Sequence, residues 1–171
     1  MGVARADGPE LDTDEAFQRR SWRVQRVGWA VMVVVVLAAL AGLLGSGPIS
    51  TATAVVPGTL RVEHQRFSRF KTPETLTVHL DSAATGTDRV LVGIDRRYLD
   101  DSRIDAITPP PARVHAAGDQ LVYEFAVARP GAPIIIAFLL QPERLGLVRG
   151  RVVLHAPDGA RPATFWAFVY P

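Results

Sequence analysis

The apolar run over residues 27–44 constrains the fold of this chain more than any other segment. It holds eighteen consecutive residues without a charged side chain, a proline, a serine or a threonine. An α-helix rises about 1.5 Å per residue, so the run spans roughly 27 Å, close to the thickness of the hydrocarbon core of a bilayer. Valine and leucine at the centre of a helix each favour membrane insertion by about 0.3 to 0.6 kcal/mol. The sequence therefore predicts one transmembrane helix, which we place at residues 27–47.

Charged residues are distributed unevenly around this run. Four arginines lie just before it, at Arg19, Arg20, Arg23 and Arg26. No charged residue follows it until Arg61. Because arginine and lysine accumulate on the cytoplasmic side of membrane helices, we expect a cytoplasmic N-terminus and a C-terminal domain outside the cytoplasm. Trp22 and Trp29 fit the aromatic belt at the membrane–water interface, and binding of anionic lipid or a partner is an alternative role for the arginines.

A cleaved signal peptide is the main alternative to a membrane anchor. Residues 52–54 read Ala-Thr-Ala, which has the small-x-small form of a cleavage site. The apolar run is longer than the 7 to 15 residues typical of a signal peptide, and the segment before it is long and carries five acidic residues. We therefore expect an uncleaved signal-anchor.

The segment before the membrane divides into two parts. Residues 1–11 are polar and contain Gly8-Pro9, which predicts a disordered cytoplasmic tail. Asp12, followed three residues later by Glu15, resembles a capping box and predicts an amphipathic juxtamembrane helix over residues 12–26. Since nothing breaks the helix before residue 27, we expect it to continue into the membrane.

Small residues recur four positions apart in the membrane helix. The pairs are Ala38 with Gly42 and Ala41 with Gly45. This spacing lets two helices approach closely in a bilayer, so these positions are candidates for helix packing. Because alanine and glycine are common in apolar helices, composition alone is the alternative explanation.

The composition and motifs exclude several kinds of site. The chain has no cysteine, which rules out disulfides, a thiolate nucleophile, cysteine-ligated zinc and iron–sulfur clusters. Nineteen Lys and Arg nearly balance seventeen Asp and Glu, and without a basic block we expect no nucleic-acid partner. A phosphate-binding glycine loop, a Gly-x-Ser-x-Gly elbow and a His-Glu-x-x-His motif are all absent from the sequence. We expect neither a cofactor nor a catalytic residue.

The chain beyond a small-residue linker at 48–58 has a hydropathy period of two, as β-strands do. Candidate strands cover residues 60–65, 76–81, 90–95, 104–108, 121–127, 133–140, 147–155 and 163–170. One helical turn is predicted among them, at 97–102. Because glycine and proline separate the strands, we predict a mainly β domain over residues 59–171. Its expected fold is an antiparallel β-sandwich of seven or eight strands, immunoglobulin-like or similar.

Two of these strands are apolar on both faces. Residues 133–140 are too short for a second membrane span and are flanked by prolines, so we expect a strand inside a sheet. Residues 147–155 and 163–170 are predicted to form a closing hairpin around Pro157-Asp158-Gly159. The last segment is either a central strand or an edge that another subunit covers.

Two segments are candidates for an interaction surface. The first interleaves aromatic and cationic side chains, at Arg66, Phe67, Arg69, Phe70 and Lys71. It suits anionic headgroups or an acidic partner, and an ordinary loop with two buried phenylalanines is the alternative. The second is the densest charged segment, with Asp95, Arg96, Arg97, Tyr98, Asp100 and Asp101. It is a candidate for docking a partner or a cation, although its acids lack the spacing of a calcium loop and a solvated turn is the alternative.

The four histidines fall on separate predicted strands or loops, at His64, His79, His115 and His155. None is paired at the spacing of a metal site, so we predict no metal ligands. Since His79 and His155 alternate with apolar residues, we expect them on a solvated face. Only the fold decides whether two histidines meet an acid such as Glu63 or Asp81 across neighbouring strands.

The N-terminal part also resembles a known group of proteins. The residues from Phe17 to Trp29, Phe-Gln-Arg-Arg-Ser-Trp-Arg-Val-Gln-Arg-Val-Gly-Trp, precede an apolar span and Gly47-Pro48. This arrangement resembles short single-pass proteins of Gram-negative bacteria, mainly over residues 15–50. The resemblance implies a bacterial inner-membrane location, with the C-terminal domain in the periplasm. It carries no activity and no site residue.

These observations favour a non-enzymatic accessory or scaffold protein. We expect a single-pass anchor that presents a β-sandwich in the periplasm, where it binds another membrane or periplasmic protein or a second copy of itself. A periplasmic module that binds a ligand or a metal, through the charged segment or the histidines, is the alternative. An enzyme is the third hypothesis, since the sequence shows no catalytic constellation.

Overall fold

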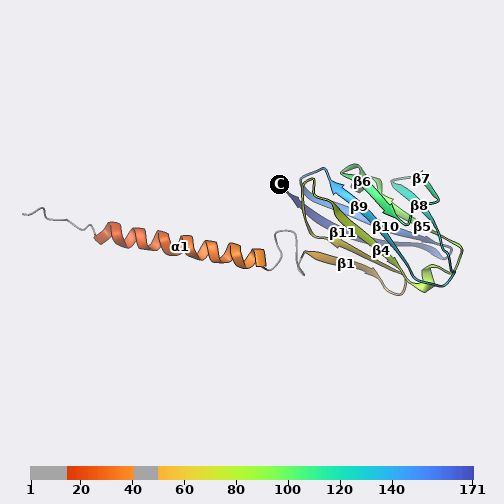
Figure 1. Cartoon of the computed structure of the whole chain (residues 1–171), viewed down its shortest axis with the longest axis horizontal. Coiled ribbons are helices and arrows are strands. Elements are labelled where there is room, and N and C mark those ends of the chain that lie inside the picture. The colour runs from red at the N-terminus through yellow and green to blue at the C-terminus, as the bar shows by residue number, and fades with distance from the viewer. Residues whose placement is uncertain (1–14, 41–49) are drawn as a thin grey trace, which may run out of the picture. The chain divides into compact units, whose positions relative to one another are not determined.

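The computed structural model describes residues 15–40 and 50–171, and side chains over residues 21–40 and 50–171. The chain divides into two compact units, Met1–Leu40 and Ala41–Pro171, which are described separately (Figure 1). The predicted disordered tail lies outside the described residues. So do the packing candidates Ala41, Gly42 and Gly45, and the side chains of Arg19 and Arg20.

The first unit is a single helix, α1 (Glu15–Leu40), of 26 residues. Its stretch Ser21–Leu40 is long and apolar enough to cross a membrane. The helix runs unbroken from the juxtamembrane part into the apolar part, as expected from a sequence without a helix breaker. Its apolar side chains are exposed on all sides, and the guanidinium of Arg26 lies 3.8 Å from the ring centre of Trp22. A helix that is apolar all round suits a lipid environment.

The second unit is a β-sandwich, which confirms the predicted mainly β fold. Its two sheets have the strand orders β1-β2-β4-β9-β6 and β3-β11-β10-β5-β8-β7. All strand pairs are antiparallel except β3 with β11. The strands are β1 (Thr51–Val56), β2 (Leu60–Gln65), β3 (Phe67–Arg69), β4 (Glu74–Leu80), β5 (Arg89–Asp95), β6 (Ser102–Thr108), β7 (Arg113–Ala117), β8 (Gln120–Ala126), β9 (Ile134–Pro142), β10 (Gly146–Ala156) and β11 (Gly159–Tyr170). Two short helices complete the domain, η1 (Ser82–Ala84) and α2 (Arg96–Asp100).

The structure has three strands that the sequence pattern does not predict, β1, β3 and β7. The predicted linker at 48–58 is wrong in part, because β1 pairs with β2 from Thr51↔Gln65 to Val56↔Leu60. Alternating threonine and alanine form this strand, and Gly58, at φ 73°, completes the turn that follows. Strand β3 has three residues, and every residue of β7 is exposed, so neither shows apolar alternation over a useful length.

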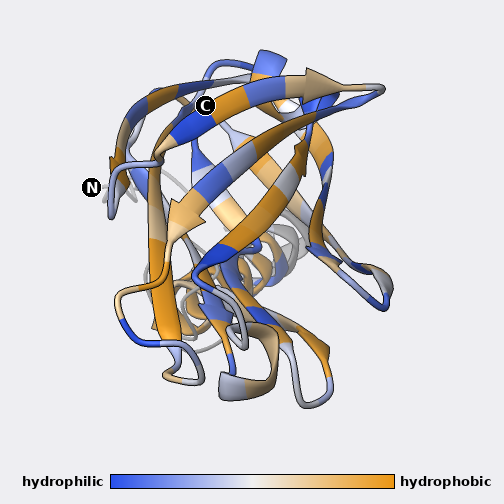
Figure 2. Ribbon diagram, turned by 90° about the vertical axis from the view of Figure 1, so that its right-hand side faces the viewer, coloured by the Kyte–Doolittle hydropathy of each residue, from blue (hydrophilic) through white to orange (hydrophobic). Residues whose placement is uncertain are grey.

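The core lies between the two sheets. Side chains alternate along each strand, and Figure 2 shows the resulting alternation of hydrophobic and hydrophilic residues. The largest fully buried side chains include Phe125 and Phe138, whose rings meet edge to face. Tyr123 packs edge-on to Phe138 at 5.3 Å between ring centres. The apolar face of each sheet is therefore buried against the other sheet.

Two further predictions are tested by the strand order. Strand β9 lies between β4 and β6, so residues 133–140 do form an interior strand. Strands β10 and β11 form the predicted hairpin, paired from Gly146↔Val169 to Ala156↔Gly159. Within residues 50–171, the strand that pairs with β11 on its other side is β3, and this pairing covers only Phe168, Val169 and Tyr170. The C-terminal strand is thus interior at its end and an edge along the rest of its length.

Candidate interaction surface

The candidate site lies on the outward face of the sheet, where β3, β10 and β11 meet. The register places Phe168 opposite both Leu147 and Phe67, and Trp166 opposite Arg149. Neighbouring residues such as Phe165 and Val169 point inward and belong to the core. We call the outward group the aromatic–arginine surface; its members are Arg66, Phe67, Leu147, Arg149, Trp166 and Phe168.

Three large apolar side chains of this surface are exposed. Leu147 is 54% exposed, Trp166 43% and Phe168 44%. Phe67 is partly buried and stands edge-on to Trp166, with 6.3 Å between the ring centres. Isolated exposed apolar residues are ordinary in proteins, whereas a contiguous group of them marks a binding surface.

Two arginines lie on the chain segments on either side of Trp166. The guanidinium carbon of Arg66 lies 5.9 Å from the ring centre of Trp166, and Arg149 lies directly opposite Trp166 on β10. Within residues 50–171, neither Arg66 nor Arg149 forms an ion pair with an acidic side chain. The surface therefore combines exposed aromatic area with positive charge that the domain does not neutralise.

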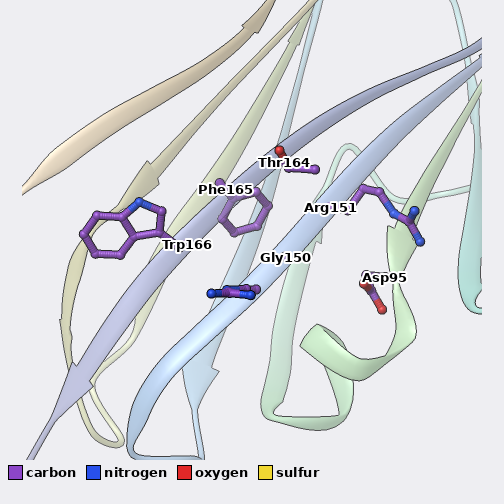
Figure 3. A pocket seen from close by; sticks show the side chains of 7 residues that line it. Asp95, Gly150, Arg151, Thr164, Phe165 and Trp166 are labelled. Atoms are coloured by element: carbon purple, nitrogen blue, oxygen red, sulfur yellow. The ribbon is translucent and has the colours of Figure 1, made fainter.

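A shallow pocket adjoins this surface. It is lined by Asp95, Arg149, Gly150, Arg151, Thr164, Phe165 and Trp166. Figure 3 shows Thr164, Phe165 and Trp166 following one another on β11, beside Gly150 and Arg151 on β10. A Cβ atom at Gly150 would collide with the ring of Phe165, so the missing side chain makes room for that ring. Arg151 forms an ion pair with Asp119, which leaves Arg149 as the arginine of this pocket without an acidic partner in residues 50–171.

A buried polar group lies behind the surface and holds β3 in place. The hydroxyl of Ser68, in β3, donates a hydrogen bond to the carboxyl group of Glu74 in β4. Burial raises the pKa of Glu74, and the hydrogen bond from Ser68 opposes this shift. Tyr98 of α2 is also buried. Burial is the main cause of the raised pKa of its phenol, and the nearby charge of Glu74 raises this pKa further. These groups are enclosed, so their role is to position β3 and α2.

His64 belongs to the same buried region. Its ring lies 4.7 Å from the ring of Phe165, between centres. Burial lowers the pKa of His64, while hydrogen bonding with the backbone of Trp166 opposes the shift. The neutral imidazole therefore packs against the inward face of the strand that carries Trp166 on its outward face.

The first predicted interaction segment divides between the surface and the core. Arg66 and Phe67 belong to the aromatic–arginine surface, and Arg69 is exposed at the end of β3. Phe70 packs against the core, and the ammonium group of Lys71 lies 5.4 Å from its ring centre. Lys71 has a φ of 56°, which belongs to the turn between β3 and β4.

The second predicted segment forms the helical turn α2. Asp95 caps it by accepting a hydrogen bond from the backbone N–H of Arg97 at 3.1 Å. Tyr98 is only 3% exposed, so its prediction as a surface residue is wrong; the helical turn points this ring into the core, edge-on to Phe165. Asp101 pairs with Arg144 at 3.0 Å. The remaining charged residues line a second shallow pocket together with Asp119: Asp95, Arg96, Arg97 and Asp100.

The histidines are spread over both sheets. Nε2 of His79 lies 3.4 Å from the carboxylate of Glu63, and Nε2 of His155 lies 3.2 Å from Oε1 of Gln120. His115 is exposed on β7. Among the described residues, no group of three His, Asp or Glu side chains is arranged to hold a metal ion.

Sequence reasoning missed four members of the site, Leu147, Arg149, Trp166 and Phe168. The C-terminal strand is recognisable as apolar on both faces, but the sequence does not say which face is covered. Leu147 and Arg149 share the outward parity of β10, and only the register of β10 with β11 places them beside the aromatic rings. That pairing of the hairpin was the available signal.

Comparisons with known proteins identify no family for this chain. No family model and no curated protein matches the sequence. Among solved structures, the chain is similar to the cohesin module of a family 33 glycoside hydrolase from Clostridium perfringens. That match has a TM-score of 0.47 and 10% identity, and covers 69% of this chain and 98% of the module. The soluble domain of PmoD from Methylocystis sp. is similar with a TM-score of 0.33 and 13% identity, over 69% of this chain and 88% of that domain.

Proposed function

We propose that this chain is a non-enzymatic, membrane-anchored accessory protein whose β-sandwich binds another membrane or periplasmic protein. The observation that carries the proposal is the exposure of Leu147, Trp166 and Phe168 side by side on one sheet face. Burying such side chains in an interface releases roughly 25 cal/mol per Å² of apolar surface. Aromatic and arginine side chains are also the residues most enriched at the energetic centres of protein interfaces.

The proposed anchor is α1, left uncleaved, with its N-terminus in the cytoplasm. Support for the orientation comes from Arg19, Arg20, Arg23 and Arg26 ahead of the apolar stretch. Support for retention comes from β1: cleavage after Ala54 would remove most of this strand, including the buried Ala52, from its pairing with β2. Cleavage at this Ala-Thr-Ala site would therefore take most of an edge strand from the sandwich.

The absence of catalysis is part of the proposal and rests on what the polar residues do. Glu74, Ser68 and His64 are enclosed in the domain and position strands. His79 lies beside Glu63, and His155 is hydrogen-bonded to Gln120. Ser68 and Glu74 are hydrogen-bonded to each other, and His64 packs on the ring of Phe165, although its buried Nδ1 makes no side-chain hydrogen bond within residues 50–171. These contacts support a structural role for the three residues.

Site-specific photo-crosslinking of the full-length protein in its native membrane tests the binding role. A benzophenone side chain at position 147 should give a protein adduct of defined mass. The same side chain at position 135 is the matched control, since Ile135 is 58% exposed and lies on the other sheet. Equal adducts from both positions, or adducts from neither, would contradict the proposal.

Single-cysteine labelling tests the topology, because the natural chain has no cysteine. In spheroplasts, a membrane-impermeant maleimide should label a cysteine in place of the exposed Asp158 without lysis. A cysteine in place of Ala6, in the N-terminal segment, should react only after lysis. The reverse pattern would overturn the orientation, and a soluble product lacking α1 would overturn the anchor.

A ligand-binding module is the second candidate function. It is favoured by the pocket beside Trp166, where Arg149 and Thr164 offer donors next to an aromatic ring. A small anion or a glycan acid would suit these groups. A thermal-shift screen of the full chain in detergent would support this function if a compound raised the melting temperature of the natural chain but not that of Arg149→Ala.

A further inference from the structure

We infer that the aromatic–arginine surface selects an acidic protein segment, whose carboxylates pair with Arg66 and Arg149 while an apolar side chain packs on Trp166. This inference rests on the proposed binding function and specifies the chemistry of the partner. It starts from the position of the two arginines on either side of β11, with Arg66 directly before β3 and Arg149 on β10.

The charge around Trp166 is not balanced within residues 50–171. The guanidinium carbon of Arg66 lies over the indole ring of Trp166, 5.9 Å from its centre, and Arg149 lies opposite Trp166 on the paired strand. The acid that lines the adjacent pocket is Asp95, and its carboxylate accepts a hydrogen bond from the backbone of Arg97. The next arginine, Arg151, is paired with Asp119.

Docking makes this imbalance costly. A partner that covers Trp166 also covers parts of Arg66 and Arg149, and removing a guanidinium from water is unfavourable unless a carboxylate replaces the lost hydration. An arginine binds a carboxylate well, because its planar guanidinium donates two parallel hydrogen bonds to the two carboxylate oxygens. A partner segment with acids flanking an apolar side chain therefore matches the order arginine, aromatic ring, arginine.

A second copy of this chain fits the surface poorly. In a symmetric dimer the same patch meets itself, so Arg66 and Arg149 of one copy would face positive charge on the other. Like charges brought together at an interface disfavour the pairing. The observations therefore favour a different chain with negative charge.

A bilayer with anionic lipid offers the same charge but a less suitable shape. Trp166 and Phe168 lie within β11, and Leu147 lies within β10, rather than at the tip of a loop. Inserting them into a membrane would also bring down Arg149, Arg151 and Asp119 along the same face. A protein segment can contact the aromatic rings without burying that neighbouring ion pair.

The test is selection from a random 12-residue peptide library displayed on phage. The target is the full-length protein in nanodiscs of phosphatidylcholine, which carry no net charge. The expected result is enrichment of peptides with Asp or Glu on either side of Phe, Leu or Trp. Changing those acids to Asn or Gln should weaken binding about tenfold, as should Arg149→Glu in the protein, because each removes close charge pairs.

Arg61→Glu is the matched control, since Arg61 is exposed on the other sheet and has no acidic partner in residues 50–171. It should leave peptide binding unchanged. Enrichment of neutral or basic peptides, binding that survives Arg149→Glu, or no enrichment at all would overturn the inference. A surface that ignores peptides but binds vesicles containing phosphatidylglycerol would identify a lipid contact instead.

The outcomes separate this inference from the proposed function. If photo-crosslinking at position 147 finds a protein partner while selected peptides are not acidic, the binding function stands and the charge selection fails. If neither experiment finds a protein contact, both fail.

Discussion

The two halves of the outward face of the six-stranded sheet differ in whether their polar side chains are paired and their apolar side chains are buried. On β5, β8 and the C-terminal end of β10, polar side chains pair with each other: Arg89 pairs with Glu124 at 2.8 Å, and His155 is hydrogen-bonded to Gln120 at 3.2 Å. Outward-facing Val122 and Val153 are buried there. On β3 and β11, Trp166 and Phe168 are exposed, and Arg66 has no acidic partner within residues 50–171.

Gly93 accounts for part of the difference. It faces outward on β5, and a Cβ atom there would collide with the amide oxygen of Gln120 and come 2.9 Å from Nε2 of His155. The missing side chain lets these two polar groups meet over the sheet. One half of the face, the closed half, is thus covered by its own side chains, and the other, the open half, is left exposed.

The largest effect should come from removing the open half. Trp166→Ser combined with Phe168→Ser should weaken partner binding by about 2 to 4 kcal/mol, the range of interface hot spots and roughly 30-fold or more. Recovery of the crosslinked or co-purified partner measures this loss. Ile135→Ser removes a similarly exposed apolar side chain from the other sheet and should not reduce recovery.

Gly150→Ala should destabilise the fold beneath that half by about 1 to 3 kcal/mol, because the added methyl group overpacks the site of the Phe165 ring. Urea unfolding of the full chain in detergent measures the change. Gly93→Ala should cost less, since the atoms it meets are the ends of flexible side chains. A larger cost at Gly93 than at Gly150 would contradict the packing argument.

Glu74→Gln should remove a pH-dependent contribution to the stability of the domain, made where the Ser68–Glu74 hydrogen bond holds β3 to β4. Burial raises the pKa of Glu74 in the folded chain, so its protonated form is favoured by folding. Its contribution to stability is then fully present below the unfolded pKa, about 4.3, and is lost as pH rises through the raised folded value. Urea midpoints measured upward from pH 4 should fall for the natural chain relative to Glu74→Gln. Parallel curves for the two proteins would rule out this role.

The smallest effect should come from the closed half. Arg89→Ala removes an exposed ion pair with Glu124, which is worth about 0.2 to 1 kcal/mol of stability. It should leave partner binding unchanged, because Arg89 lies on β5, away from the aromatic rings. Arg149→Ala should do the opposite, with little change in the unfolding midpoint and weaker binding. Equal effects of the two variants on binding would remove the distinction between the halves.

The sequence predicts much of the fold because the pattern of each strand is local. Alternation identifies β2, β4, β5 and β8, a continuous apolar run identifies β9, and the turn at Pro157-Asp158-Gly159 identifies the hairpin of β10 and β11. Strand β1 was assigned to a linker, since small residues and threonine before Pro57-Gly58 are typical of both. Strand β3 is held by its pairing with β11 and by the Ser68–Glu74 bond, which are contacts between distant segments.

The candidate site is harder to predict for the same reason. The identity of Trp166 and Phe168 as an apolar pair is visible in the sequence, but which face of β11 points outward depends on how β11 pairs with β10 and β3. Arg149 can be assigned to the candidate site only from the strand register, which places it opposite Trp166. Tyr98 is a residue that the sequence places on the surface and the structure places in the core. It lies in a charged segment, but that segment forms the helix α2, and one side of this helix faces the core.

Cysteine accessibility in living cells tests the central claim most directly, because the natural chain has no cysteine and each variant carries a single thiol. Leu147→Cys and Ile135→Cys replace side chains that are both more than half exposed, on opposite sheets. A maleimide should label position 135 equally in cells and in purified full-length protein. Position 147 should be protected in cells and become reactive on purification. Equal labelling of the two positions in cells would contradict the claim that a partner covers the aromatic–arginine surface.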